Sequence, residues 1–125
     1  MTKMVIVMRK DLNMRRGKQI AQSCHASLAI LTNMLSESGD NWTIDIPTVM
    51  GEWLKDSFTK ICVYVNSEKE LFNIYDKAKA SGMLCSIIQD AGRTEFNGVP
   101  TYTCCAIGPD YIDKIDEITG KLPLL

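Results

Sequence analysis

The chain has 125 residues, a formal net charge of −1 and 46% hydrophobic residues. This length suffices for one domain with its own core, and we expect residues 1–125 to form a single domain. The short apolar run near the N-terminus soon meets charged residues. We therefore predict neither a signal peptide nor a membrane span, and expect a cytoplasmic protein.

Basic side chains are concentrated near the N-terminus. Residues 1–25 contain six Lys or Arg and one Asp, whereas the remaining residues contain eight Lys or Arg and fourteen Asp or Glu. This uneven distribution indicates a local contact with phosphate groups. The alternative is a solvated charged face without a ligand.

Residues 3–9 are short, branched and apolar, which predicts a buried first strand. A turn over residues 10–16, with Asn13 as a candidate N-cap, leads into a helix predicted over residues 14–35. An apolar stripe at helical spacing predicts the buried side of this helix. It comprises Ile20, Cys24, Leu28, Leu31 and Leu35.

A second face of the same helix carries Lys18, Gln22 and His25 at positions i, i+4 and i+7. These side chains follow Arg15 and Arg16, close to a helix N-terminus, where backbone N–H groups favour anions. A helix that only supports a core does not need a cation, an amide and an imidazole in a row. The pattern predicts half of a functional site.

The remaining elements follow from turn residues and periodicity. Residues 36–47 predict a polar loop, followed by a short helix ending at Lys55 with Trp53 and Leu54 packed inward. Ser67 and Glu70 form a capping box that opens a helix ending at Gly82. Strands are predicted over residues 59–65, 84–88 and 101–107, and Gly108-Pro109 is expected to end the last of them. A closing helix is predicted over residues 110–119.

Strands alternating with helices predict an α/β fold, a three-layer sandwich with a mixed four-stranded sheet flanked by helices. Its topology is expected to be Rossmann-like without a dinucleotide motif, and its third and fourth strands to be antiparallel neighbours. No glycine-rich nucleotide motif is present, and the five cysteines match no metal-ligand spacing. We therefore predict no cofactor, no metal and reduced core thiols, with Cys104 and Cys105 facing opposite ways on a strand.

A second group of polar residues follows the predicted third strand. Asp90, Arg93 and Thr94 surround Gly92, which permits a tight or left-handed turn. Open α/β sheets place their ligand crevices at such strand ends. Thr101 and Thr103 follow on one face of the next strand. The alternative is a loop held only by its own Asp–Arg or Asp–backbone bonds.

These residues resemble a known family, the peptidyl-tRNA hydrolases of the second, archaeal and eukaryotic type. MVIVMRKDLNMRRGKQIAQSCHA is similar to the family's first strand and helix, DAGRT to its signature loop, and CAIGP with ITGKLPLL to its closing strand and C-terminus. Ile20 and the loop continuation Glu95-Phe96-Asn97 depart from the pattern. The loop is also one residue longer, which leaves open whether Thr101 or Thr103 takes the family's threonine position.

The resemblance implies hydrolysis of the ester joining a peptide to the 3′-terminal ribose of tRNA, a mixed four-stranded sheet, and often a homodimer. By matching position, it assigns catalytic or binding roles to six residues. They are Lys18, Gln22, His25, Asp90, Thr94 and Thr103. The resemblance also implies peptidyl-tRNA as the substrate, contacted at its acceptor end, and we expect no membrane partner.

Ester hydrolysis needs a positioned water, a proton acceptor and groups that stabilise the oxyanion. Asp90 is the candidate for orienting or deprotonating that water. A free Asp has a pKa of about 3.9, and a neighbouring Lys18 would lower it further, so placement of the water is favoured over strong base catalysis. Lys18 would stabilise negative charge or hold the terminal phosphate, and Thr94 and Thr103 would bind the water or the ribose hydroxyls.

Arg15, Arg16 and Arg93 are the candidates for gripping the acceptor-stem backbone. His25 is either a general base or, as we favour, a packing or orienting histidine, because it lies about two helical turns beyond Lys18. Cys24 and His25 form no thiol dyad, since consecutive helical residues point about 100° apart. The alternative to an enzyme is a non-catalytic module on the same fold that binds RNA or protein.

Overall fold

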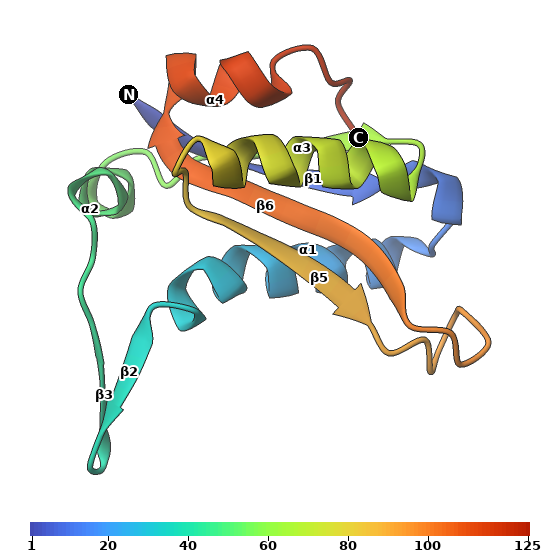
Figure 1. The fold of residues 1–125 in the computed structure, drawn as a ribbon, viewed down its shortest axis with the longest axis horizontal. Coiled ribbons are helices and arrows are strands. Elements are labelled where there is room, and N and C mark those ends of the chain that lie inside the picture. Colours follow the sequence, from blue (N-terminus) through green and yellow to red (C-terminus); the bar gives the residue numbers. More distant parts are fainter.

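The computed structural model describes residues 1–125 as a sheet enclosed between helices (Figure 1). The strands of the main sheet are β1 (Thr2–Arg9), β4 (Lys60–Val65), β5 (Cys85–Asp90) and β6 (Thr101–Tyr111), in the order β4-β1-β6-β5. β1 and β4 are parallel, whereas β6 is antiparallel to both β1 and β5. The predicted mixed sheet and its antiparallel final pair are confirmed.

Helices cover both faces of this sheet. A 3-10 turn η1 (Lys10–Leu12) leads from β1 towards α1 (Arg16–Thr32), and α1 and α2 (Thr48–Lys55) lie on one face. The other face carries α3 (Glu68–Ala80) and α4 (Ile112–Thr119). Figure 1 shows α3 and α4 on the side of the sheet opposite to α1. The predicted three-layer sandwich is thus confirmed.

Strand alternation divides the buried side chains into two cores. From β1, Met4, Ile6 and Met8 contribute to the core beneath α1 and α2, whereas Val5 and Val7 contribute to the core beneath α3 and α4. β6 does the same with Cys104 and Cys105, so their predicted opposite orientation is confirmed. All five cysteines are free, but Cys24 is exposed and is not a core thiol.

The caps of α3 follow the sequence prediction. The Ser67 hydroxyl accepts a hydrogen bond from the Glu70 N–H at 3.0 Å, and the Glu70 carboxylate accepts one from the Asn66 N–H at 2.6 Å. Gly82 ends the helix with φ +72°. In contrast, Asn13 caps the C-terminal end of η1, and α1 begins without a side-chain cap. The prediction that Asn13 is the N-cap of the long helix was wrong.

Most of the predicted buried stripe of α1 was also wrong, and of its residues Leu31 packs, partly buried, against the core beneath α1. Ile20 and Leu28 are 58% and 59% exposed, and Cys24 is exposed as well. The helix instead buries Gln22, Ala26 and Ile30, which repeat at every fourth position. Apolar residues occupy two faces of this helix, so periodicity alone could not decide which one meets the sheet.

Three further predictions need correction. Residues 36–47 are not a simple loop, because β2 (Leu35–Ser38) and β3 (Asn41–Ile44) pair as an antiparallel hairpin. β6 continues through Gly108-Pro109 to Tyr111, and α4 starts only at Ile112. In α2, Trp53 is buried as predicted, but Leu54 is 37% exposed.

Candidate active site

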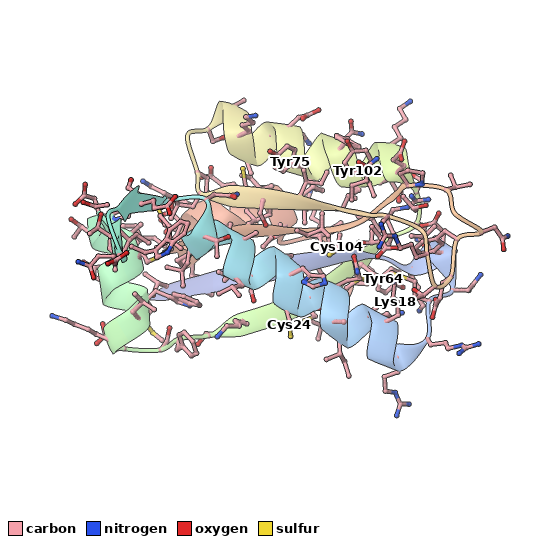
Figure 2. All side chains as sticks on the ribbon, turned by 90° about the horizontal axis from the view of Figure 1, so that it is seen from below. Lys18, Cys24, Tyr64, Tyr75, Tyr102 and Cys104 are labelled. Atoms are coloured by element: carbon pink, nitrogen blue, oxygen red, sulfur yellow. The ribbon has the colours of Figure 1, made fainter.

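The candidate site lies at one edge of the main sheet, where β1, β4 and β5 have their carboxyl ends. The N-terminal end of α1 reaches this edge and brings Lys18 towards the end of β5. Figure 2 shows Lys18 near the start of α1, beside the loop that joins β5 to β6. The two halves of the site predicted from the sequence therefore meet.

Asp90, the last residue of β5, is the centre of the cluster. Its Oδ1 accepts a hydrogen bond from Lys18 Nζ at 2.8 Å and one from Gln22 Nε2 at 3.3 Å. Its Oδ2 accepts the backbone N–H of Gly92 at 2.8 Å. The side chains of Lys18 and Asp90 are 16% and 14% exposed, so this ion pair is largely shielded from solvent.

The Lys18 ammonium, through its hydrogen bond and charge, lowers the pKa of Asp90, and the bonds from Gly92 and Gln22 act in the same direction. Partial burial opposes this effect but does not outweigh it. Asp90 is therefore ionised at neutral pH. As a weak base, it is suited to orient a water molecule rather than to remove its proton outright.

Lys18 Nζ also donates to the Thr94 hydroxyl at 2.9 Å. An ammonium group has three N–H donors, and two of them are directed to Asp90 and Thr94. The third can stabilise an oxyanion or hold a phosphate oxygen. Thr94 is exposed, so its hydroxyl can reach a water or a ribose.

The loop between β5 and β6 depends on Gly92. Its φ of +83° is the left-handed conformation predicted for this position, and a Cβ there would collide with the backbone of Val99. Phe96 of the same loop packs against the core beneath α1, and its ring centroid lies 6.0 Å from Lys18 Nζ. Glu95 accepts a hydrogen bond from the Arg15 N–H at 3.4 Å. These contacts join the loop to the start of α1.

Glu95 and Phe96 were not among the predicted site residues. The only signal in the sequence was their position directly after DAGRT. Their contacts span about eighty residues of chain, so local pattern could not find them. In the sequence, this segment stands out merely as a departure from the family pattern.

Gln22 and Thr103 form a buried layer behind Asp90. Gln22 is 2% exposed and Thr103 is 0% exposed, and the Thr103 hydroxyl donates to Gln22 Oε1. Gln22 is therefore neither a surface glutamine nor directly accessible to substrate. Thr103 is connected to Asp90 through Gln22, whereas the Thr101 hydroxyl donates to the backbone carbonyl of Val99. Of the two threonines, Thr103 is the one connected to the cluster.

His25 is not brought into the cluster. It is exposed on α1 and makes no hydrogen bond to Lys18, Gln22 or Asp90. Of the favoured roles, packing or orienting, the exposure of His25 contradicts the packing role. Arg15, Arg16 and Arg93 are exposed near the cluster, at the start of α1 and in the β5–β6 loop.

A thiol nucleophile has no place here. Cys104 Sγ donates to the Gln22 carbonyl oxygen at 3.3 Å, but burial raises the pKa of this thiol to about 11, so it stays protonated. No three His, Cys, Asp or Glu side chains gather closely enough to hold a metal ion. No helix combines the length and the apolar composition needed to cross a membrane.

We expect Thr103→Val to weaken the buried layer, because Gln22 Oε1 would be left without a donor. The free energy of unfolding should fall by about 1–3 kcal/mol, measured by urea denaturation. The value of kcat for the ester hydrolysis that the resemblance implies should fall about tenfold while KM stays unchanged. Thr103→Ser keeps the hydroxyl and should retain kcat. Equal losses in the Val and Ser variants would contradict a role through the hydrogen bond.

These features define an α/β protein with an ion-paired polar site at the carboxyl edge of its sheet. The chain matches the model of the family "Peptidyl-tRNA hydrolase PTH2" over residues 2–125. A protein named peptidyl-tRNA hydrolase from Methanocaldococcus jannaschii is 47% identical over 123 residues, covering 98% of this chain and 99% of the relative. Another with this name, from Sulfurisphaera tokodaii, is 41% identical over 124 residues, covering 99% and 98%. The chain therefore belongs to the PTH2 family of peptidyl-tRNA hydrolases, and the resemblance found in the sequence is confirmed.

Proposed function

We propose that this chain hydrolyses the ester bond between the peptide and the 3′-terminal ribose of tRNA in peptidyl-tRNA. Membership of the PTH2 family supports this reaction. The observation that carries the assignment of the site is the Asp90 carboxylate held by Lys18, Gln22 and the Gly92 N–H, with an exposed threonine beside it.

In the proposed reaction, Asp90 orients a water molecule towards the ester carbonyl carbon. The water oxygen forms a bond to that carbon, and Lys18 stabilises the negative charge that develops on the carbonyl oxygen. The bond to the ribose 3′-oxygen then breaks, and the proton lost by the water is transferred to this oxygen through Asp90. Thr94 binds the water or a ribose hydroxyl. We assign the proton to Asp90 rather than to His25, because His25 has no hydrogen bond to the cluster.

We also propose that the reaction needs no cofactor. Lys18 supplies the positive charge that a metal ion would otherwise provide at the carbonyl oxygen. Turnover should therefore survive exhaustive dialysis against EDTA, and an analogue with an amide in place of the ester should be cleaved far more slowly. Loss of activity on dialysis that added metal restores would contradict this proposal.

The assay that tests the function is peptide release from an N-blocked aminoacyl-tRNA, followed by separation of free and charged tRNA. Turnover by the wild type that disappears in a folded Asp90→Asn variant is the expected result. The alternative is a non-catalytic module. A folded wild type that binds tRNA in a salt-dependent manner without releasing peptide would overturn hydrolysis and leave an RNA-binding protein.

We further propose that Arg15, Arg16 and Arg93 contact phosphates of the acceptor stem. Replacing all three by Gln should weaken tRNA binding, and should reduce the slope of log K against log salt by about 0.9 for each duplex phosphate that is no longer bound. Filter binding between about 50 and 200 mM salt would serve as the measurement. Lys114→Gln, an exposed change on α4, is the matched control and should leave the slope unchanged. An unchanged slope in the triple variant would contradict the assignment.

Three smaller proposals accompany this function. We place the protein in the cytoplasm, where its substrate arises during translation. Residues 1–125 are proposed to act as one domain, which predicts a single cooperative unfolding transition. We also propose a homodimer, as the family resemblance suggests.

A further inference from the structure

The hairpin of β2 and β3, residues 35–44, projects away from the sandwich (Figure 1). We call this hairpin the arm. Its strands pair only with each other, and none of its residues belongs to either buried core. A two-stranded hairpin without packing is marginally stable in water, so the arm would gain stability from a partner.

The two faces of the arm differ in chemistry. Leu35 pairs with Ile44, and Glu37 pairs with Trp42, which places these four side chains on one face. Ser36, Ser38, Asn41 and Thr43 form the other face. Trp42 is 63% exposed and Leu35 is 36% exposed. An amphipathic strand pattern normally has its apolar face covered, yet Leu35 and Trp42 are left exposed and only Ile44 is partly buried.

The outward side of α1 is a second uncovered apolar surface, which we call the α1 face. It comprises Ile20, Cys24 and Leu28 of α1, and Figure 2 shows Cys24 pointing away from its helix on this side. Two adjacent hollows of about 400 Å³ and 110 Å³ lie between these residues and β4 or the end of α2. The smaller hollow includes Trp53 and Phe58, and both include Ser27 and Lys60.

The charges of the arm and of the α1 face are opposite. Residues 19–54 contain no Lys or Arg. The arm carries Glu37 and Asp40, and Asp45 directly follows it. Lys60 is the only charged residue in the two hollows of the α1 face, and no acidic residue lines them. An acidic apolar arm therefore complements an apolar groove that contains a lysine.

We propose that the arm of one copy docks on the α1 face of a second copy, with Trp42 as its anchor. A two-fold axis makes the contact reciprocal, so that each copy gives one arm and receives the other. This inference rests on the homodimer proposed above and specifies the surfaces that form it. The acidic arm is poorly suited to tRNA phosphates or to an anionic membrane, both of which would repel it.

Single substitutions test the two surfaces separately. Trp42→Ala removes the anchor, and Leu28→Asp places a charge in the groove near Leu31 and Phe58. Each variant should raise the dimer dissociation constant by about 30-fold or more, as measured by analytical ultracentrifugation. Thr43→Ala, on the polar face of the arm, is the control and should leave the constant unchanged.

Mixing the two variants provides the sharper test. In a reciprocal dimer of the two variants, the intact arm of the Leu28→Asp chain meets the intact groove of the Trp42→Ala chain. Neither variant homodimer has a contact in which both surfaces are intact. The mixture should therefore form more heterodimer than either variant forms homodimer. Contact between two arms, or between two α1 helices, predicts no such recovery, and its absence would overturn the inference.

The outcomes distinguish this inference from the other proposals. A monomeric wild type at all concentrations would overturn both the homodimer and the docking, whereas a wild-type dimer unaffected by Trp42→Ala would overturn the docking alone. Weaker tRNA binding by Trp42→Ala, with sedimentation unchanged, would overturn the docking and assign the arm to RNA instead. Peptide release by the wild type reports separately on hydrolysis.

Discussion

Asp90→Asn is expected to lower kcat for peptide release about 100- to 1000-fold, the largest loss expected of any single substitution in the cluster. Asparagine has nearly the same shape and can still accept a hydrogen bond from Lys18, but it carries no charge with which to orient the water and pass its proton on to the leaving ribose oxygen. Single-turnover assays with saturating enzyme would measure the chemical step directly. Asp113→Asn, an exposed change on α4, is the matched control and should retain full activity.

The pH dependence gives a second measurement on the same residue. Lys18 holds the pKa of Asp90 below its usual value, so the carboxylate stabilises the folded protein above about pH 4, the unfolded pKa. This contribution is lost as the pH falls through the lower, folded pKa. The difference in Tm between wild type and Asp90→Asn should therefore shrink as the pH falls below about 4, measured by calorimetry. A difference that grows at low pH would contradict the ion pair.

Lys18→Met is expected to produce the second largest loss, about 100-fold in kcat, because methionine keeps much of the length but removes the charge that faces the carbonyl oxygen. The pKa of Asp90 should rise, since Lys18 is the main cause of its lowering. The acidic limb of the pH–rate profile should move upward accordingly. Circular dichroism and Tm would verify that the variant folds.

The kinetics of Lys18→Met also separate its two candidate roles. A fall in kcat with KM unchanged indicates stabilisation of the transition state, whereas a rise in KM alone indicates a hold on the terminal phosphate. If Lys18 and Asp90 act as one unit, the double variant should lose little more than Asp90→Asn alone. Losses that multiply would contradict a joint role.

Much of the architecture was determined locally. The short branched run of β1 indicates a buried strand by its composition. The capping box of Ser67 and Glu70 and the glycine at position 82 specify the two ends of α3 through contacts within a few residues. The opposite orientation of Cys104 and Cys105 follows from strand geometry alone. Lys18, Asp90 and Thr94 could likewise be singled out, because these polar residues stand where a purely structural helix or strand end does not require them.

The orientation of α1 illustrates where local pattern failed. Lys18, Gln22, Ala26 and Ile30 repeat at every fourth position, so the helix face that supplies the site continues into the face that packs on the sheet. Treating the functional row and the core stripe as separate faces led to the wrong buried side. In the structure, Ile20 and Leu28 are exposed, and they lie beside the hollows that we assign to a second copy.

By itself, the sequence determined the α/β class, the order of the main elements and most residues of the polar cluster, since these depend on periodicity and on side-chain chemistry. Only the tertiary structure decided that Thr103 rather than Thr101 reaches the cluster, that Gln22 is buried between Thr103 and Asp90, and that residues 35–44 form an arm. The physical reason is sequence distance. Gln22 and Thr103 are 81 residues apart, and whether they meet depends on how α1 and β6 pack rather than on their neighbours in the chain.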